Sequence, residues 1–390
     1  MASWEESTTI ARRLHALDPE SADVRRDLAV VLERVGNARL GDGAVEPALA
    51  AYRESLALFR LLAAQDPEDA EAQRVVAAGL QRVGDALSAA GSRDAAEAAY
   101  AEGVDILRAL PGPMPGEGMV ALDLAIGLER LGDLRRDRDR EAGAAAYSEA
   151  VEIRRLQAAT VPDDASRQAA FAASLEKLGY VQAMSGDGPA AIATMEDIVA
   201  ARRRLVELQP ASIDAAWQLG EDLLRLGNLH LAIDAPLAAL AVWQENLAVR
   251  ERMANAAPDD ATVRRRLAGG YANVAFGQLF AGDFAAAETA ARQALELAPG
   301  EIAFATNLAH ALMLQGEIEA ANRLYRDHRG SDLGGRRWED LVLDDFDRLR
   351  QSGVAHPHMA EIEALYHQPN DAMAISENDA KSAPAGPEPD

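Results

Sequence analysis

The sequence predicts an all-α fold: an α-solenoid of about seven helix-turn-helix repeats with capping helices at both ends. Three observations support this. Prolines recur about every 48 residues, the hexapeptide LERVGN at residues 32–37 returns four times in altered form, and the core composition is small and aliphatic. Hydrophobic residues make up 49% of the 390 residues and aromatic residues only 5%, which favours closely packed helices over a sheet core.

Prolines set the period. Spacings of 48, 48, 47, 48 and 48 residues separate Pro19, Pro67, Pro115, Pro162, Pro210 and Pro258. The glycine of the hexapeptide follows the first five prolines by 17 residues, at Gly36, Gly84, Gly132, Gly179 and Gly227. Pro299 comes only 41 residues after Pro258, so the array ends on a shorter period.

The residues before each glycine form one stripe of a helix. In the first unit Leu28, Ala29, Leu32, Val35 and Gly36 have helical spacing, and later units repeat it. A glycine inside a helix costs about 1 kcal/mol relative to alanine. Its recurrence suggests that a second backbone passes too close for a Cβ.

A second helix completes each unit. It places a small residue at Ala48, Ala96, Gly143, Ala191 or Ala239, and four positions later a large one at Tyr52, Tyr100, Tyr147, Met195 or Trp243. The small residues let the two helices approach, and the large one fills the gap toward the next unit. Helix pairs are therefore expected at 21–40/45–65, 69–90/93–110, 117–138/141–159, 164–185/188–208, 212–232/235–256, 260–281/284–297 and 301–315/317–328.

The ends of the array differ from its middle. Residues 4–17 match a second helix whose first helix is missing. Either this half repeat caps the array of residues 4–329, which we expect, or a longer ancestor was cut at this point. Residues 337–367 are expected to form two C-terminal capping helices. The polar, proline-rich residues 368–390 are expected to be a disordered tail. The breaker-rich connector LPGPMPGEGM at 110–119 is a place for a kink in the stack.

This pattern resembles the tetratricopeptide repeat family. The last units match its ordinary 34-residue form: AGDFAAAETAARQALELAPGE contains Ala287, Ala291 and Ala294, and NLAHALMLQGEIEAANRLY contains Gly316, Ala321 and Tyr325. The 48-residue units resemble a bacterial variety with longer helices. Over residues 4–329 the resemblance implies a right-handed α-solenoid whose concave groove binds other proteins.

Composition and motifs argue against other classes. The net charge of −24 argues against nucleic acid or an anionic membrane as a partner. There is no cysteine, no phosphate-binding loop and no metalloprotease or esterase motif, so we expect neither an enzyme nor a cofactor. No apolar run reaches the length of about 18 residues that a membrane span needs, and we expect a cytoplasmic protein.

Two small constellations have stronger structural explanations. His356, His358, Glu361 and His367 come nearest to a metal cluster, but zinc ligands normally have tighter spacing, so we expect a surface cap and no metal. Ser174 and Lys177 have the spacing of one serine nucleophile arrangement, yet Lys177 simply occupies the recurrent basic position of its repeat.

By the resemblance, residues one after and three before each glycine face the groove. They are Asn37, Asp85, Asp133, Tyr180 and Asn228, with Glu33, Gln81, Glu129, Glu176 and Leu224. The first half of such a groove is polar and acidic and would suit a protein or peptide with basic residues. The alternative is that these acids are merely solvated. Family members that clamp a carboxylate need a lysine where Glu33 stands, so we expect no such clamp.

A basic residue stands two positions before each glycine, at Arg34, Arg82, Arg130, Lys177 and Arg225. One interpretation is an ion-pair ladder with acids of the same or a neighbouring helix, such as Glu129 or Asp133 beside Arg130. The other is an anion-binding ladder at the groove edge.

Two functions remain after the sequence is considered. The first is a non-enzymatic scaffold that binds a peptide or partner protein in its groove. The alternative is a ligand- or peptide-sensing regulatory module for a linked or neighbouring effector, such as a protease, kinase or NTPase in bacterial signalling. The half repeat at residues 4–17 favours the alternative.

Overall fold

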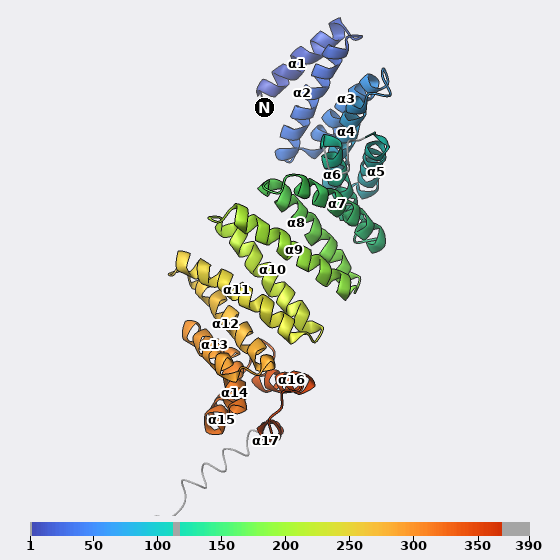
Figure 1. Cartoon of the computed structure of the whole chain (residues 1–390). Coiled ribbons are helices and arrows are strands. Elements are labelled where there is room, and N and C mark those ends of the chain that lie inside the picture. Colours follow the sequence, from blue (N-terminus) through green and yellow to red (C-terminus); the bar gives the residue numbers. More distant parts are fainter. Residues whose placement is uncertain (1, 112–117, 369–390) are drawn as a thin grey trace, which may run out of the picture. The chain divides into compact units, whose positions relative to one another are not determined.

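The computed structural model describes residues 2–111 and 118–368, and its regular secondary structure is helical (Figure 1). Those residues form 17 helices and no strand, with one isolated β-bridge between Asp332 and Arg337. The all-α helical-repeat prediction is confirmed. The chain divides into two compact units, Met1–Pro210 (unit 1) and Ala211–Asp390 (unit 2).

Unit 1 is a stack of helical hairpins. Its helices are α1 (Ala2–Leu17), α2 (Ala22–Gly41), α3 (Val45–Ala63), α4 (Ala70–Ala89), α5 (Arg93–Ala109), α6 (Gly118–Arg135), α7 (Arg140–Thr160), α8 (Ala165–Met184) and α9 (Gly188–Leu208). Successive helices pack against one another, and α4 also contacts α6. We call α2, α4, α6 and α8 the A helices of this unit, and α3, α5, α7 and α9 its B helices.

Unit 2 continues with three hairpins and two further helices. These are α10 (Ile213–Ala232), α11 (Pro236–Ala256), α12 (Ala261–Ala281), α13 (Phe284–Leu297), α14 (Phe304–Leu314), α15 (Ile318–Asp327), α16 (Trp338–Gln351) and α17 (His358–Tyr366). Phe346 of α16 and Met359 of α17 are buried in one cluster with Leu308 and Tyr325. The two C-terminal helices therefore share the core of α14 and α15.

Side-chain caps explain where the first helix of a hairpin begins. Asp69 Oδ1 accepts hydrogen bonds from the backbone N–H groups of Glu71 at 2.9 Å and Ala72 at 3.1 Å. Asp164 and Asp260 cap α8 and α12 in the same way. A carboxylate here satisfies orphan donors and complements the positive end of the helix dipole. Part of the chain's acidity thus serves to start helices.

The turn between the two helices of a hairpin uses a left-handed residue. Gly91 has a φ of +75° between α4 and α5, and Gly282 has a φ of +76° between α12 and α13. Asp234 has a φ of +56° between α10 and α11, which is uncommon outside glycine. This conformation lets the chain reverse within a few residues.

Some expectations fall on residues outside those described. They are the kink in the 110–119 connector, of which 112–117 are not described, and the tail, which is not described beyond residue 368. Among the described helices, none combines the length and hydropathy needed to cross a bilayer.

Candidate interaction face

The repeated glycine of an A helix lies against an aromatic ring of the following B helix. A Cβ on Gly84 would overlap the ring of Tyr100, closer than real Cβ atoms approach. The same contact joins Gly36 to Tyr52, Gly132 to Tyr147 and, in unit 2, Gly227 to Trp243. The expected backbone crossing is therefore wrong at these positions, because a side chain occupies the space.

A close backbone approach does occur elsewhere in the repeat. A Cβ on Gly143 of α7 would lie 2.9 Å from the backbone N and Cα of Arg136, just beyond α6. Gly143 is the small residue of its B helix, where other units have alanine. The tight approach thus falls at the hairpin turn.

The tyrosine hydroxyl reaches the residue that follows the glycine. Tyr100 donates a hydrogen bond to Asp85 Oδ1 at 2.7 Å. Burial and then this bond to a carboxylate raise the pKa of Tyr100, because both disfavour the phenolate. Equivalent bonds join Tyr52 to Asn37 at 2.8 Å and Tyr147 to Asp133 at 2.7 Å. A B helix thereby fixes one polar side chain of its A helix.

The recurrent basic residue pairs with an acid on the preceding A helix. The pairs are Arg82 Nη2 with Glu33 at 2.8 Å, Arg130 Nη2 with Asp85 at 3.0 Å and Lys177 Nζ with Asp133 at 2.6 Å. They connect α2 to α4, α4 to α6 and α6 to α8. The side chains are 23–41% exposed, so each pair stabilises the fold by less than about 1 kcal/mol.

The remaining two basic positions differ. Arg225 in unit 2 pairs with Asp222 of its own helix at 3.1 Å. Arg34 is exposed on the first A helix and forms no ion pair with any residue that the structure describes. The pairing between A helices is therefore a property of three successive rungs in unit 1.

The other predicted groove residues of unit 1 are also bonded within the unit. Glu129 accepts hydrogen bonds from Arg154 Nε at 3.0 Å and Ser174 Oγ at 2.7 Å. Glu176 pairs with Arg202, and Gln81 Nε2 donates to the backbone carbonyl of Asp123 at 2.8 Å. Each of the predicted acids thus has a basic partner, so this face has nearly balanced charge.

Tyr180 departs from this pattern. It follows Gly179, where other units have an acid or asparagine, and it is 54% exposed. The Arg136 guanidinium lies 5.6 Å from its ring centroid. Thr194, and not the predicted Met195, faces Gly179, with Cγ2 3.3 Å from where a Cβ would be. No aromatic ring therefore fills the space beside Gly179.

The predicted positions in unit 2 are not brought into such a network. Leu224 is partly buried and packs against the cluster that contains Trp243, whereas Asn228 is exposed. Trp243 replaces the tyrosine, and its Nε1 is buried without a hydrogen-bond partner among the described residues. The Trp243 indole thus fills the space beside Gly227, but it lacks the hydrogen bond that the tyrosines of unit 1 make to their A helices.

Three buried arginines escaped the sequence interpretation. Arg154, Arg202 and Arg250 are 6–8% exposed and stand on α7, α9 and α11. They pair with Glu129, Glu176 and Glu221, the last at 3.9 Å. Burial lowers the pKa of Arg250. Their spacing of 48 residues equals the proline period, and this regularity was the signal available to find them.

A further ladder runs along α1 and the B helices. Arg12, Arg60 and Arg108 pair with Glu54, Glu102 and Glu149, each at 2.5 Å. Helix α1 thus makes with α3 the same ion pair that α3 makes with α5.

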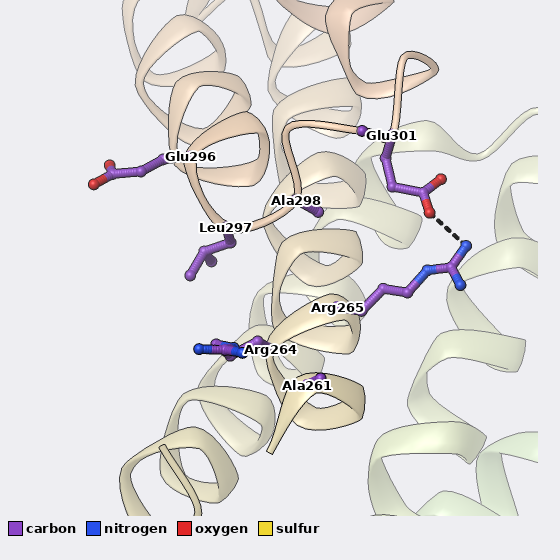
Figure 2. Close-up of a pocket in the computed structure, with 8 residues that line it drawn as sticks. Ala261, Arg264, Arg265, Glu296, Leu297, Ala298 and Glu301 are labelled. Carbon is purple, nitrogen blue, oxygen red and sulfur yellow. Dashed lines mark ion pairs between the residues drawn. The ribbon is translucent and has the colours of Figure 1, made fainter. Parts of the chain in front are cut away.

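Unit 2 has a surface hollow between the start of α12 and the end of α13. Figure 2 shows it with Arg265 paired to Glu301, while Arg264 and Glu296 extend toward solvent. The hollow has a volume of about 600 Å³. Its charged side chains are not buried, so it offers no enclosed site for a ligand.

The two constellations weighed for catalysis or metal binding have structural partners. Ser174 donates to Glu129, while Lys177 pairs with Asp133. His358 is buried, with Nε2 2.7 Å from Asn322 Oδ1 and Nδ1 2.9 Å from Glu361. Among the residues that the structure describes, no group of three His, Asp or Glu side chains could hold a metal ion.

A tetratricopeptide repeat family model matches residues 279–342, which include α13, α14 and α15. No curated protein matches the chain in sequence. Similar solved structures include BtubC (BKLC) from P. vanneervenii, with 22% identity, a TM-score of 0.46 and coverage of 65% of this chain and 90% of that chain.

Two others are the C-terminal part of a TPR repeat-containing protein from Cytophaga hutchinsonii and the apo form of RapI. The first has 14% identity, covers 78% of this chain and 95% of that chain, and has a TM-score of 0.42. RapI has 11% identity, covers 90% of this chain and 82% of that chain, and has a TM-score of 0.45. At such low identity and TM-score these likenesses support no inference about function. The chain therefore carries a segment of the tetratricopeptide repeat family at residues 279–342.

Proposed function

We propose that this protein is a non-enzymatic scaffold that binds a partner protein or peptide on the A-helix face of unit 1. The tetratricopeptide repeats support protein binding as the general role. We call the predicted polar side chains of the unit 1 A helices the row; they are Glu33, Asn37, Gln81, Asp85, Glu129, Asp133 and Glu176. The observation that supports this face most is the exposed pair Tyr180 and Met184, which interrupts this otherwise self-paired row.

Tyr180 and Met184 suit a binding anchor. They are one helical turn apart on α8 and are 54% and 50% exposed. Tyrosine beside an arginine is typical of residues that dominate binding energy, and here Arg136 lies over the ring. Methionine adapts its shape to a partner surface. A partner would bury both side chains at the end of the row.

A basic partner would have to compete with existing ion pairs. Asp85 and Asp133 already accept hydrogen bonds from a tyrosine and a basic side chain. We therefore assign the row a role in orientation, while the anchor contributes most of the affinity.

The test compares partner capture from an extract of the source organism by wild type and by Tyr180→Ala/Met184→Ala. The matched control is Ile10→Ala/Leu61→Ala, which removes two side chains of similar exposure from α1 and α3. We expect quantitative mass spectrometry to show about fivefold or greater loss of specific partners with the first variant only. Equal recovery with both variants would contradict the proposed face.

A further inference from the structure

A cleft of about 380 Å³ lies at the N-terminal ends of α6 and α8. Met119 and Leu122 of α6 and Ala170 of α8 give it apolar walls. Arg167 of α8 lines it as well, together with Arg154 and Gln157 of α7. Arg154 and Gln157 are more than nine-tenths buried, so the polar part of the cleft is built into the core.

The two arginines have N–H groups left over. Arg154 donates through Nε to Glu129 at 3.0 Å and through Nη1 to Gln157 Oε1 at 3.3 Å. Arg167 donates through Nη1 to the Gln157 carbonyl at 3.3 Å, and its Nε is 3.3 Å from Asp164. A guanidinium has five N–H donors. Neither Nη2 donates to another described residue, so both arginines keep donors for a ligand.

The charged residues that line the cleft are arginines, although each has an acidic partner. Arg154 and Arg167 line the cleft, whereas Glu129 and Asp164 do not. The N-terminus of α8 is not the site, because Asp164 already accepts hydrogen bonds from the N–H groups of Ser166 and Arg167. The side chains of Arg154 and Arg167 therefore determine the ligand's charge.

We propose that this cleft binds an acidic side chain of a partner polypeptide, with a neighbouring aliphatic side chain against Met119, Leu122 and Ala170. A carboxylate matches the arginine donors with charge-assisted hydrogen bonds, and the apolar walls accept the adjacent residue. The inference rests on the proposed scaffold function and names the chemistry of its partner.

The cleft also sets a distance to the anchor at Tyr180 and Met184. Ala170 and Met184 are 14 residues apart, close to four helical turns, so they share a face about 21 Å apart. An extended peptide spans that distance in about six or seven residues. The partner motif is therefore an acidic and an aliphatic residue, with a further apolar residue about six positions away.

The test selects a random dodecapeptide phage library, fused at its C-terminus to the coat protein, on the full chain. We expect the enriched peptides to contain Asp or Glu next to an aliphatic residue. Synthetic forms of these peptides with Gln or Asn in place of the acid should bind wild type about tenfold more weakly.

Two cleft variants and one control test the same peptides. Arg167→Gln removes a guanidinium, and Ala170→Leu fills the cleft. Either should weaken binding about tenfold. Arg155→Gln removes the neighbouring, exposed arginine that pairs with Glu152 outside the cleft, and binding should remain at the wild-type level. Circular dichroism verifies that each variant is folded.

Other outcomes would overturn the proposal that this cleft binds an acidic side chain. They are no enriched peptide, enrichment without acids, or equal binding to wild type and Arg167→Gln. Selection of a library with free C-termini that enriches only terminal carboxylates would also overturn it. Peptides that lose binding with Tyr180→Ala/Met184→Ala but not with the cleft variants would retain the scaffold function and refute the cleft alone.

Discussion

Asp85 of α4 accepts hydrogen bonds from Tyr100 of α5 and from Arg130 of α6. One carboxylate thus joins the two helices of its own hairpin and the first helix of the next. Asp133 repeats this arrangement with Tyr147 and Lys177. The recurring LERVGN-type hexapeptide supplies both the acceptor of one hairpin and the donor that reaches back to its predecessor.

The two bonds to Asp85 should respond differently to salt. Asp85→Asn keeps an acceptor for Tyr100 but removes the charge facing Arg130, and should cost less than about 1 kcal/mol because the pair is partly exposed. Tyr100→Phe should cost about 1 kcal/mol through a part-buried hydrogen bond. In urea unfolding, the destabilisation by Asp85→Asn should be smaller at about 1 M salt than at low salt, because salt screens the ion pair. The destabilisation by Tyr100→Phe should be the same at both salt concentrations. A salt-independent loss in Asp85→Asn would contradict the ladder.

Two glycines should tolerate alanine unequally. Gly84→Ala forces a Cβ into the Tyr100 ring and should destabilise the fold by about 1–3 kcal/mol, less the helix-propensity gain of about 1 kcal/mol. Gly179→Ala meets only Thr194 Cγ2 at 3.3 Å and should be neutral or stabilising. Thermal unfolding of both variants measures the difference. If Gly84→Ala were the more stable of the two, the ring would not be what requires glycine.

The repeat architecture was predictable because its signals are local. The proline period, the apolar stripe ending at Gly36 and the small residue at Ala48 each depend on one helix or one hairpin. Capping aspartates such as Asp69 reinforce the helix starts. A Cβ-free position also signals a close neighbour, although it does not distinguish a backbone from the Tyr52 ring that occupies the space.

The partners across repeats were not predictable from one sequence. Arg130 has acids on its own helix at Glu129 and Asp133, yet it pairs with Asp85, 45 residues earlier. That choice depends on how far one hairpin is shifted against the next. Thr194 and Met195 differ by about 100° around a helix, so spacing alone could not decide which faces Gly179.

Alkaline pH should destabilise unit 1 through the tyrosines that pack against its repeated glycines. Burial raises the pKa of Tyr52, Tyr100 and Tyr147 above the ordinary value near 10. Below pH 10 their contribution is fully present. As the pH rises above 10 the unfolded chain loses these protons first, so stability falls, and the slope approaches its limit of about 1.4 kcal/mol per pH unit only for a tyrosine whose folded pKa is well above the pH. Urea unfolding between pH 9 and 11 should show a shallower fall for Tyr100→Phe/Tyr147→Phe. An unchanged slope would contradict this assignment.

Neutralising the row should affect partners less than removing the anchor. Glu33→Gln, Asp85→Asn, Asp133→Asn and Glu176→Gln together remove four charges that are already paired. We expect the captured partners to persist, in contrast to their loss with Tyr180→Ala/Met184→Ala. Glu54→Gln, Glu102→Gln and Glu149→Gln on the B helices provide the matched control. Loss of partners only with the row variant would instead favour a basic partner.

The C-terminal helices of unit 2 should depend on a buried polar contact. His310 is fully buried, with Nδ1 2.8 Å from Tyr325 Oη and Nε2 3.4 Å from Asp345 Oδ2 on α16. His310→Leu leaves the nearly buried carboxylate of Asp345 without this partner and should cost about 3 kcal/mol. Hydrogen exchange should then be faster in α16 and α17 than in α10 and α11.

A second substitution identifies the cause of that loss. Adding Asp345→Leu to His310→Leu removes the stranded carboxylate, and apolar groups in both places avoid the desolvation penalty. The double variant should therefore be more stable than His310→Leu alone, although it lacks one more polar contact. If the double variant were less stable, loss of packing around Phe346, which lies 5.2 Å from the His310 ring, would explain the effect better than an unpaired charge. The order of the two melting temperatures thus shows whether the buried polar contact or the apolar packing accounts for the effect of His310→Leu on the C-terminal helices.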